Sequence, residues 1–244
     1  MIVKNLNVSY DDTTVLENIN FTIKEHLCIL GSNGSGKSTL AKALCGLLPY
    51  EGSIQLEVYE LSELPPIERA KRVAYIPSKM ESFEQFTTVE EFVLLGRYPH
   101  KASFKNYSIE DKNIVREVLS ELSINELAPL RLHSLSSGQQ QLVLIAQALA
   151  QKSTLLIFDE PTSNLDPKNT ALFVKELQKL RESFTTILIT HDIQLAAYLN
   201  DPVLFIQDKN AKLYEEDFFK TDRLSQAYGI NFKNENGLLG IHYE

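Results

Sequence analysis

A glycine-rich loop at residues 31–39, Gly-Ser-Asn-Gly-Ser-Gly-Lys-Ser-Thr, constrains this chain more than any other feature. It satisfies the pattern G-x-x-x-x-G-K-[ST] and lies between residues 27–30, an apolar run suited to a buried strand, and residues 40–44, which continue as a helix. This order suits phosphate binding because glycines let backbone N–H groups approach phosphate oxygens and the helix start adds positive charge. A chance Gly/Ser turn is disfavoured, so the sequence predicts a nucleotide site.

Two side chains of this phosphate loop are expected to act directly on the ligand. Lys37 would neutralise the β and γ phosphates, and the hydroxyl of Ser38 would face Mg²⁺, which prefers oxygen ligands and retains waters. The residues expected to contact nucleotide here are Gly31, Ser32, Asn33, Gly34, Ser35, Gly36, Lys37, Ser38 and Thr39.

Composition limits the remaining possibilities. A chain of 244 residues with 43% hydrophobic residues can fill a core, no apolar run reaches the length of a membrane span, and the N-terminus lacks the layout of a signal peptide, so a cytoplasmic protein is expected. Cys28 and Cys45 lie in apolar segments and are expected to be buried thiols. The net charge of −8 disfavours binding to nucleic acid or anionic lipid, so any membrane role must run through a protein partner.

Before and after the phosphate loop the pattern is that of strands. Apolar and polar residues alternate over 6–10 and 19–23, which predicts two antiparallel strands joined by the polar turn 11–14. Tyr10 ends the first strand, where it can stack on a base or simply cover a sheet face. Further strands are expected at 53–58 and 73–76.

From residue 79 to 150 the pattern becomes helical. One helix is expected to open at 88–91, and residues 108–111 resemble a capping box ahead of a second. The loop 96–101 between them is polar and aromatic, which suits either a partner surface or a solvated loop. We therefore expect one α/β domain over 1–244, with a core of 1–78 and 151–244 and an inserted helical lobe at 79–150.

Polar residues follow the later apolar segments. Residues 135–139 precede an apolar helix, so Ser136 is expected either to cap it or to bind an anion. The apolar run 155–158 predicts a buried strand that ends in Asp159 and Glu160, at the strand end where α/β sheets place ligands. There Asp159 can hold a Mg²⁺ water and Glu160 can orient or deprotonate an attacking water. His191 follows another predicted strand, 186–190, and is either structural or part of the same site. After strands at 203–206 and 212–214 we expect a polar tail.

In this order the segments resemble the ATP-binding subunit of ABC transporters over nearly the whole chain. The matching parts are the phosphate loop, a signature loop at 135–139, a Walker B strand ending in Asp159 and Glu160, a D-loop at 163–166 and a switch residue, His191. The resemblance implies a P-loop NTPase core, a mixed sheet with an antiparallel β subdomain, and ATP with Mg²⁺ as cofactors. It assigns catalysis to Lys37, Glu160 and His191, metal binding to Ser38 and Asp159, and further nucleotide contacts to Tyr10, Ser136, Ser137, Gly138, Gln139 and Asp166.

The resemblance also implies partners. Two copies would form a head-to-tail homodimer on ATP binding, in which the signature loop of one faces the γ phosphate held by Lys37 of the other, so the serines become ligands. The dimer would sit beneath integral-membrane permease subunits at the inner face of the cell membrane and serve a substrate-binding protein indirectly. No nucleic acid partner is expected.

Two positions depart from the family pattern. Ser137 replaces the first of two signature glycines, which should weaken binding mildly at most because its N–H can still reach phosphate. Ser78 closes the segment 75–78, where the family usually has glutamine that reaches Mg²⁺ and water. Gln85, further along the chain, would supply the missing amide only if the loop is rearranged.

The resemblance implies an ATPase that drives import. Residues 95–100 look like a segment of ATPases that serve importers of ferric siderophores, haem and vitamin B12, so an iron or related metal chelate is the expected cargo, with another metal ion or chelate as the alternative. A soluble ABC ATPase that acts on DNA or the ribosome is disfavoured, because such relatives usually carry a long coiled coil or two phosphate loops. A non-hydrolysing structural subunit stays open because of Ser78.

Overall fold

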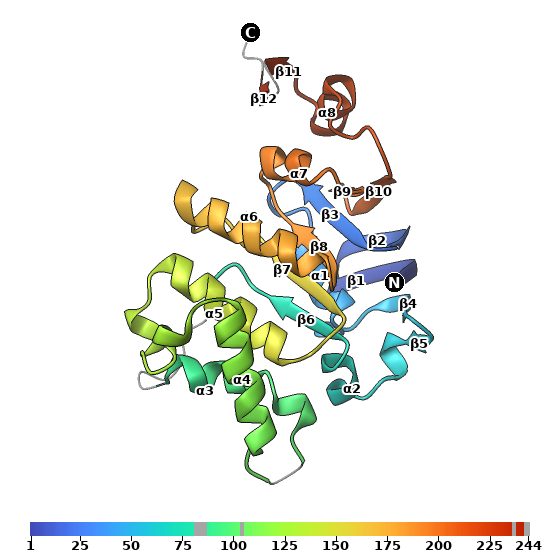
Figure 1. The fold of residues 1–244 in the computed structure, drawn as a ribbon. Coiled ribbons are helices and arrows are strands. Elements are labelled where there is room, and N and C mark those ends of the chain that lie inside the picture. Colours follow the sequence, from blue (N-terminus) through green and yellow to red (C-terminus); the bar gives the residue numbers. More distant parts are fainter. Residues whose placement is uncertain (81–86, 103–104, 236–237, 242–244) are drawn as a thin grey trace. The chain divides into compact units, whose positions relative to one another are not determined.

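The computed structural model describes residues 1–80, 87–102, 105–235 and 238–241 (Figure 1). It forms two compact units, the first made of Met1–Leu64 with Thr186–Glu244 and the second of Pro65–Thr185. Gln85 lies outside the described residues. The expected division into a core of 1–78 and 151–244 and a lobe of 79–150 stays a prediction.

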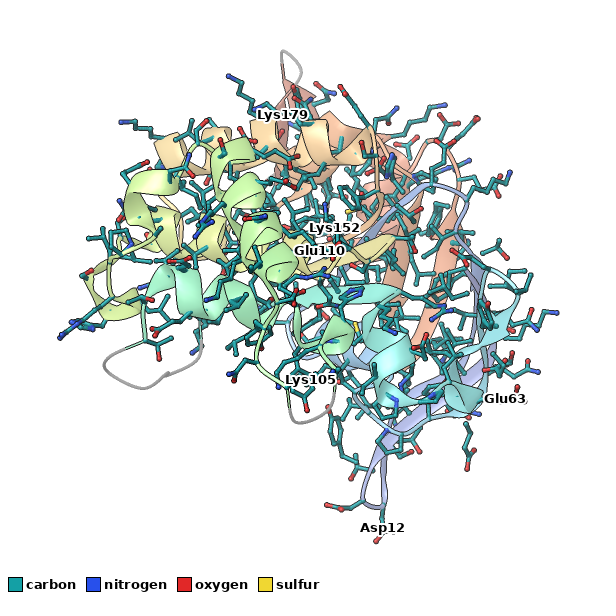
Figure 2. The ribbon with its side chains drawn as sticks, turned by 60° about the horizontal axis from the view of Figure 1, so that its bottom comes forward. Asp12, Glu63, Lys105, Glu110, Lys152 and Lys179 are labelled. Atoms are coloured by element: carbon teal, nitrogen blue, oxygen red, sulfur yellow. The ribbon has the colours of Figure 1, made fainter. Side chains whose placement is uncertain are left out.

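The first unit begins with an antiparallel sheet in the order β2-β1-β4-β5. Its strands are β1 (Ile2–Tyr10), β2 (Thr13–Thr22), β4 (Glu51–Leu56) and β5 (Tyr59–Glu60), followed by the 3-10 turn η1 (Leu61–Glu63). Leu6, Val8, Ile19 and Phe21 are buried, as the alternation predicted, whereas Tyr10 is exposed. The turn is shorter than expected, since Tyr10 already pairs with Thr13, and Figure 2 shows Asp12 at the hairpin tip.

The same unit contains the strand that precedes the phosphate loop. β3 (His26–Gly31) pairs in parallel with β8 (Thr185–Ile189) on one side and with β9 (Val203–Gln207) on the other, and β10 (Asn210–Tyr214) pairs antiparallel with β9. Helices α1 (Lys37–Leu44) and α7 (Ile193–Leu199) follow β3 and β8. An interior parallel strand is covered on both faces, which explains why residues 27–31 of β3 are all buried.

The C-terminal residues differ from the expected polar tail. They form α8 (Thr221–Tyr228) and a hairpin of β11 (Phe232–Glu235) and β12 (Leu238–Ile241), drawn in red in Figure 1. Phe218 is only 2% exposed and packs against Phe205 with ring centroids 5.6 Å apart. The prediction of a polar tail was wrong because aromatic residues that lie among many charged ones complete a core begun by Cys28 and Phe205.

The second unit combines two parallel strands with most of the helices. β6 (Val73–Ile76) pairs with β7 (Leu155–Asp159), and Tyr75 lies opposite Ile157. The helices and turns are α2 (Pro66–Ala70), α3 (Val89–Leu95), η2 (Tyr98–His100), α4 (Ile109–Glu121), η3 (Asn125–Leu127), η4 (Leu132–Ser134), α5 (Ser137–Ala150) and α6 (Pro167–Arg181). Ser108 caps α4 with a complete capping box, as predicted from the sequence, and Thr88 opens α3 at the predicted place with a capping box of its own.

A buried ion pair anchors the loop 96–101. Arg97 donates from Nε to Oδ1 of Asp111 at 3.0 Å and from Nη1 to the carbonyl oxygen of Ala150 at 2.7 Å. Arg97 thereby connects the end of α3 to α4 and α5, whereas neighbouring Tyr98 is 61% exposed. Within the described ranges, no helix combines the length and apolar composition needed to cross a bilayer.

Candidate nucleotide-binding site

The phosphate loop joins β3 to α1 through conformations that need glycine. A Cβ atom at Gly31 would collide with the backbone carbonyl of Ile206, because β9 runs directly beside it. Gly36 has a φ of 100°, and a Cβ there would come within 3.0 Å of Val15 and 2.9 Å of Leu16. Since L-residues rarely adopt such φ values, this loop path fixes the glycines that the sequence pattern requires.

Lys37 is folded back over this loop. Its ammonium donates to the carbonyl oxygens of Gly31, at 3.0 Å, and Ser32, at 3.1 Å, and the residue is only 6% exposed. Ser32, Asn33 and Gly34 are exposed. A cation held this way adds positive charge to a loop already at the N-terminus of α1, which favours an anionic ligand.

The loop also contains a buried polar atom that fits this ligand. Ser35 Oγ is buried and has no hydrogen-bond partner among the described residues. An unpaired buried hydroxyl is costly, and a phosphate oxygen would supply its acceptor. Ser38 is exposed at the second position of α1, and Thr39 is half-buried beside it. The residues present therefore fit a bound nucleotide phosphate.

His191 lies at the same edge of the sheet as the phosphate loop. Because β3 and β8 are parallel, with Ile29 opposite Ile189, their carboxyl ends meet at one edge. The backbone N–H of Asp192 donates to Oγ1 of buried Thr190 at 3.0 Å, and Asp192 caps α7 by accepting from the N–H of Leu195, also at 3.0 Å. These bonds fix the turn on which His191 is exposed.

Tyr10 ends β1 and is 44% exposed. The next strand, β2, carries Val15 and Leu16, the two residues that pack against Gly36. The hairpin thus passes beside the phosphate loop. Stacking of Tyr10 on a base stays a prediction.

In the second unit, Asp159 is held by a tyrosine. Asp159 is the last residue of β7 and is 5% exposed, and the hydroxyl of Tyr75 donates to its Oδ2 at 2.7 Å. Glu160 follows with a φ of 52°, a left-handed conformation that is unfavourable for a residue with a side chain. The chain reverses there, since the N–H of Ser163 donates to the carbonyl oxygen of Glu160 at 3.2 Å.

The signature loop ends in a complete capping box. Ser136 Oγ accepts from the N–H of Gln139 at 3.3 Å, and the side chain of Gln139 accepts from the N–H of Ser136 at 2.9 Å. Ser136 and Ser137 are exposed at the start of α5, a helix of 14 residues. Capping of α5 is therefore observed, and it leaves the predicted anion binding by the serines untested.

Asn169 connects the signature loop to the D-loop. Asp166 caps α6 by accepting from the backbone N–H of Asn169 at 2.8 Å and from its Nδ2 at 2.9 Å. The same side chain lies directly against Gly138, where a Cβ atom would meet Asn169 Oδ1 at 2.5 Å. Asp166 therefore acts as a helix cap in this structure, and its predicted contact with nucleotide stays a prediction.

Ser78 is linked to the D-loop through its backbone. Asn164 Nδ2 donates to the carbonyl oxygen of Ser78 at 3.2 Å. Sequence reasoning did not anticipate Asn164, Asn169 or Tyr75 as partners of site residues. The one local signal was the spacing of Asn169, three positions after the cap Asp166, because Tyr75 and Asp159 lie on different strands 84 positions apart.

The carboxylates do not form a metal cage of their own. Among the described residues, no group of three or more His, Cys, Asp or Glu is arranged to hold a metal ion. Mg²⁺ in nucleotide enzymes typically uses one or two protein ligands, with phosphate oxygens and waters completing its shell. A hydroxyl at Ser38 and a carboxylate at Asp159 are the donor types that such an ion takes.

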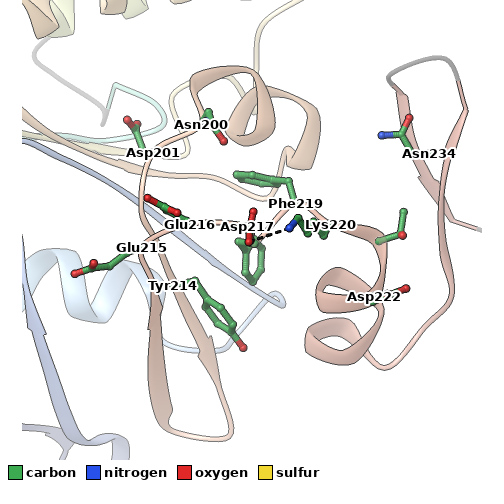
Figure 3. A pocket seen from close by; sticks show the side chains of 12 residues that line it. Asn200, Asp201, Tyr214, Glu215, Glu216, Asp217, Phe219, Lys220, Asp222 and Asn234 are labelled. Carbon is green, nitrogen blue, oxygen red and sulfur yellow. Dashed lines mark ion pairs between the residues drawn. The ribbon is translucent and has the colours of Figure 1, made fainter.

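A separate cavity in the first unit has the wrong charge for phosphate. It has a volume of about 870 Å³ and lies among the C-terminal residues (Figure 3). Its acidic side chains include Glu215, Glu216 and Asp217, and its one lysine, Lys220, forms an ion pair with Asp217 at 2.9 Å. None of its lining residues belongs to the phosphate loop.

The fold and the phosphate loop together define a P-loop ATPase cassette, and comparison with known proteins gives the family. The ABC transporter family matches residues 16–163. An uncharacterised ABC transporter ATP-binding protein of Haemophilus influenzae is 37% identical over 84% of this chain and 80% of its own. A probable siderophore transport system ATP-binding protein of Bacillus subtilis is 33% identical over 93% of this chain and 84% of its own.

A solved structure agrees. An ABC transporter of the metal-chelate type, in an inward-facing conformation, superposes with a TM-score of 0.81 at 27% identity and covers 99% of this chain and 95% of its own. This chain belongs to the ABC transporter family, whose ATP-binding cassettes hydrolyse ATP to power transport. The predicted family, the P-loop NTPase fold, ATP as ligand and the ATPase activity are confirmed.

Proposed function

We propose that this chain powers an importer of ferric siderophore, haem or a related metal chelate, by binding and hydrolysing MgATP as a dimer beneath a membrane permease. The observation that carries the proposal is the phosphate loop, with the buried ammonium of Lys37 and the unpaired hydroxyl of Ser35. The relatives named for siderophore transport and metal-chelate transport support the cargo class.

Nucleotide binding is assigned to the first unit. Backbone N–H groups of residues 31–39 and the start of α1 would bind the phosphates, and Lys37 would exchange its carbonyl contacts for the β and γ phosphate oxygens. Tyr10 would stack on adenine, and its 44% exposure leaves a ring face available for that contact.

Hydrolysis is assigned to Ser38, Asp159, Glu160 and His191, the residues that the family's motifs supply. When bound, Mg²⁺ neutralises charge on the β and γ phosphates, and Ser38 and Asp159 would hold it. Glu160 would accept the proton of the attacking water or orient that water, and His191 would hold the γ phosphate and the water in line. The position of Glu160 supports this role, because it follows Asp159 directly at the carboxyl end of β7, where α/β sheets place ligands.

The active form is proposed to be a head-to-tail homodimer. Ser136, Ser137, Gly138 and Gln139 open α5, so the exposed start of this helix would offer its N–H groups to the γ phosphate bound by the second copy. Asp166 would lie at the same dimer contact. The serine at position 137 is compatible with this role and should weaken binding mildly at most, since its N–H can still donate to phosphate.

A reconstitution experiment tests the proposal. The chain should be co-expressed with the integral-membrane proteins that co-purify with it. ATP turnover and uptake should then be measured in vesicles with a ferric siderophore, haem and Mn²⁺ as alternative cargoes. We expect ATP-dependent uptake of an iron chelate. Uptake of Mn²⁺ alone would instead support a metal-ion importer. Purification of the chain without any bound membrane protein would support a soluble ABC ATPase. Binding of MgATP without turnover would support a non-hydrolysing subunit.

A further inference from the structure

A hydrogen bond between neighbouring strands fixes the carboxylate of Asp159. In the parallel pair of β6 and β7, Tyr75 lies opposite Ile157, and Asp159 lies two residues further along β7. Because side chains two positions apart share a face, Tyr75 and Asp159 project to the same side of the strand pair. Two residues span about 6.6 Å along a strand, a distance that the long side chain of tyrosine can cover.

This contact is short and well protected. The Tyr75 hydroxyl lies 2.7 Å from Asp159 Oδ2, as expected for an O–H group that donates to a charged oxygen. Asp159 is 5% exposed, so water competes weakly for it. An ionised carboxylate has about four acceptor positions, so one bond from a phenol fixes its rotation and is compatible with other ligands.

The hydroxyl of Tyr75 is not needed for the packing of β6. The neighbouring residues Ala74 and Ile76 are purely apolar and buried, whereas Tyr75 adds a hydroxyl that ends on the carboxylate. A phenylalanine would fill nearly the same volume without that bond, so the hydroxyl is separable from packing by a single substitution.

We propose that Tyr75 is a positioning residue for magnesium, acting through Asp159. By holding Oδ2, it sets the plane of the carboxylate in the orientation that the metal or its water requires. The inference rests on the proposed function, which assigns Asp159 to the metal. Partners that orient a metal-binding group typically change metal affinity by an order of magnitude or more when removed.

The test uses metal binding. Full-length Tyr75→Phe and the unmodified chain should be titrated with Mn²⁺ in the presence of a non-hydrolysable ATP analogue, with bound metal followed by electron paramagnetic resonance. We expect Tyr75→Phe to raise the Mn²⁺ dissociation constant roughly tenfold and to leave metal-free nucleotide binding unchanged. Tyr98→Phe, an exposed tyrosine in the same unit, is the matched control.

A double-mutant cycle shows whether the effect passes through Asp159. In an Asp159→Asn background, Tyr75→Phe should add no further loss of metal affinity. Two results overturn the inference, provided that the unmodified chain binds metal and nucleotide. One is equal or tighter Mn²⁺ binding by Tyr75→Phe, and the other is a loss of Mn²⁺ affinity from Tyr75→Phe that is just as large in the Asp159→Asn background. If the unmodified chain shows no metal-dependent nucleotide binding, the proposed function itself is wrong, and the inference with it.

Discussion

The phosphate loop and the carboxylate segment are built in different ways. The loop is shaped by its backbone, since glycines at fixed spacing pass between Ile206, Val15 and Leu16 and leave N–H groups for an anion. The carboxylate segment, residues 159–166, is shaped by side chains. Tyr75 donates a hydrogen bond to Asp159, and Asn169 donates one to Asp166. Asn164 within the segment donates one to the carbonyl oxygen of Ser78. A backbone site follows from a local motif, whereas a side-chain site depends on partners up to 86 positions apart in the chain.

Removal of the charge in the backbone-built site should have the largest effect. Lys37→Ala deletes the ammonium that binds Gly31 and Ser32 and is proposed to bind phosphate. We expect ATPase activity to disappear and nucleotide affinity to fall on the order of a hundredfold, with the fold retained. Calorimetry with MgATP measures this, and Lys42→Ala on the same helix is the control. Unchanged binding by Lys37→Ala would refute the loop assignment.

The next largest effect should come from the contact between Gly138 and Asn169. In Gly138→Ala the new methyl group meets the Asn169 amide, which must move and loosen its bonds to Asp166. Overpacking of this kind costs about 1–3 kcal/mol, so ATP-dependent dimerisation should weaken on the order of tenfold. Analytical ultracentrifugation with ATP measures it.

Two further variants check the cause. Gly240→Ala, at a glycine with open space around its Cα, should behave as the unmodified chain. In an Asn169→Ala background the clash is absent, so Gly138→Ala should cause no additional loss of ATP-dependent dimerisation. An additional loss in that background would mean that the effect does not act through Asn169.

A smaller effect is expected at Ser78. Its carbonyl bond to Asn164 belongs to the backbone, so Ser78→Gln should retain the loop and add an amide that reaches farther than the serine hydroxyl. We expect basal MgATP turnover to rise on the order of fivefold and to depend less on the permease, because one hydrogen bond replaces a water-mediated contact. Turnover should be assayed with and without permease, alongside Gln85→Ala. If Ser78→Gln alters neither turnover nor Mg²⁺ dependence, the serine is silent.

The smallest functional effect should come from the ion pair that lies outside both sites. Burial by itself raises the pKa of Asp111, but hydrogen bonds from Ser108 and Arg97 outweigh it and hold this pKa below its ordinary value of 3.8. A carboxyl group with a depressed pKa stabilises the fold above its unfolded pKa, and this contribution is lost as pH falls through the folded pKa.

Asp111→Asn tests that linkage. It should lower the free energy of unfolding at pH 7 by about 1 kcal/mol, because the amide keeps part of the bonding, and it should flatten the acid dependence below about pH 4. ATPase activity should stay unchanged. Urea unfolding at several pH values measures the effect, and an equally steep acid dependence in the variant would contradict the assignment.

Local sequence was enough for the elements that carry their own signals. The strand before the phosphate loop, the buried strand that ends in Asp159, the start of α3 and the capping box at Ser108 are all where the periodicity and caps predicted them. Helix α8 and the hairpin that follows were missed although Leu224, Ala227 and Tyr228 recur at helical spacing, because that pattern is short and the burial of Phe218 depends on distant Phe205. Tyr75 was missed because a hydrogen bond between side chains on different strands leaves no spacing pattern, whereas Asn169 lies three positions after the helix cap Asp166, a local spacing that was overlooked.

The central claim is that this chain hydrolyses ATP with Glu160 and dimerises around the nucleotide. Glu160→Gln should bind ATP normally and hydrolyse it about a hundredfold or more slowly, because the amide cannot accept the proton from water. Bound ATP should then hold two copies together. Size-exclusion chromatography of Glu160→Gln with and without ATP should show a dimer only with ATP, whereas a variant that stays monomeric and hydrolyses ATP at the normal rate would contradict the account.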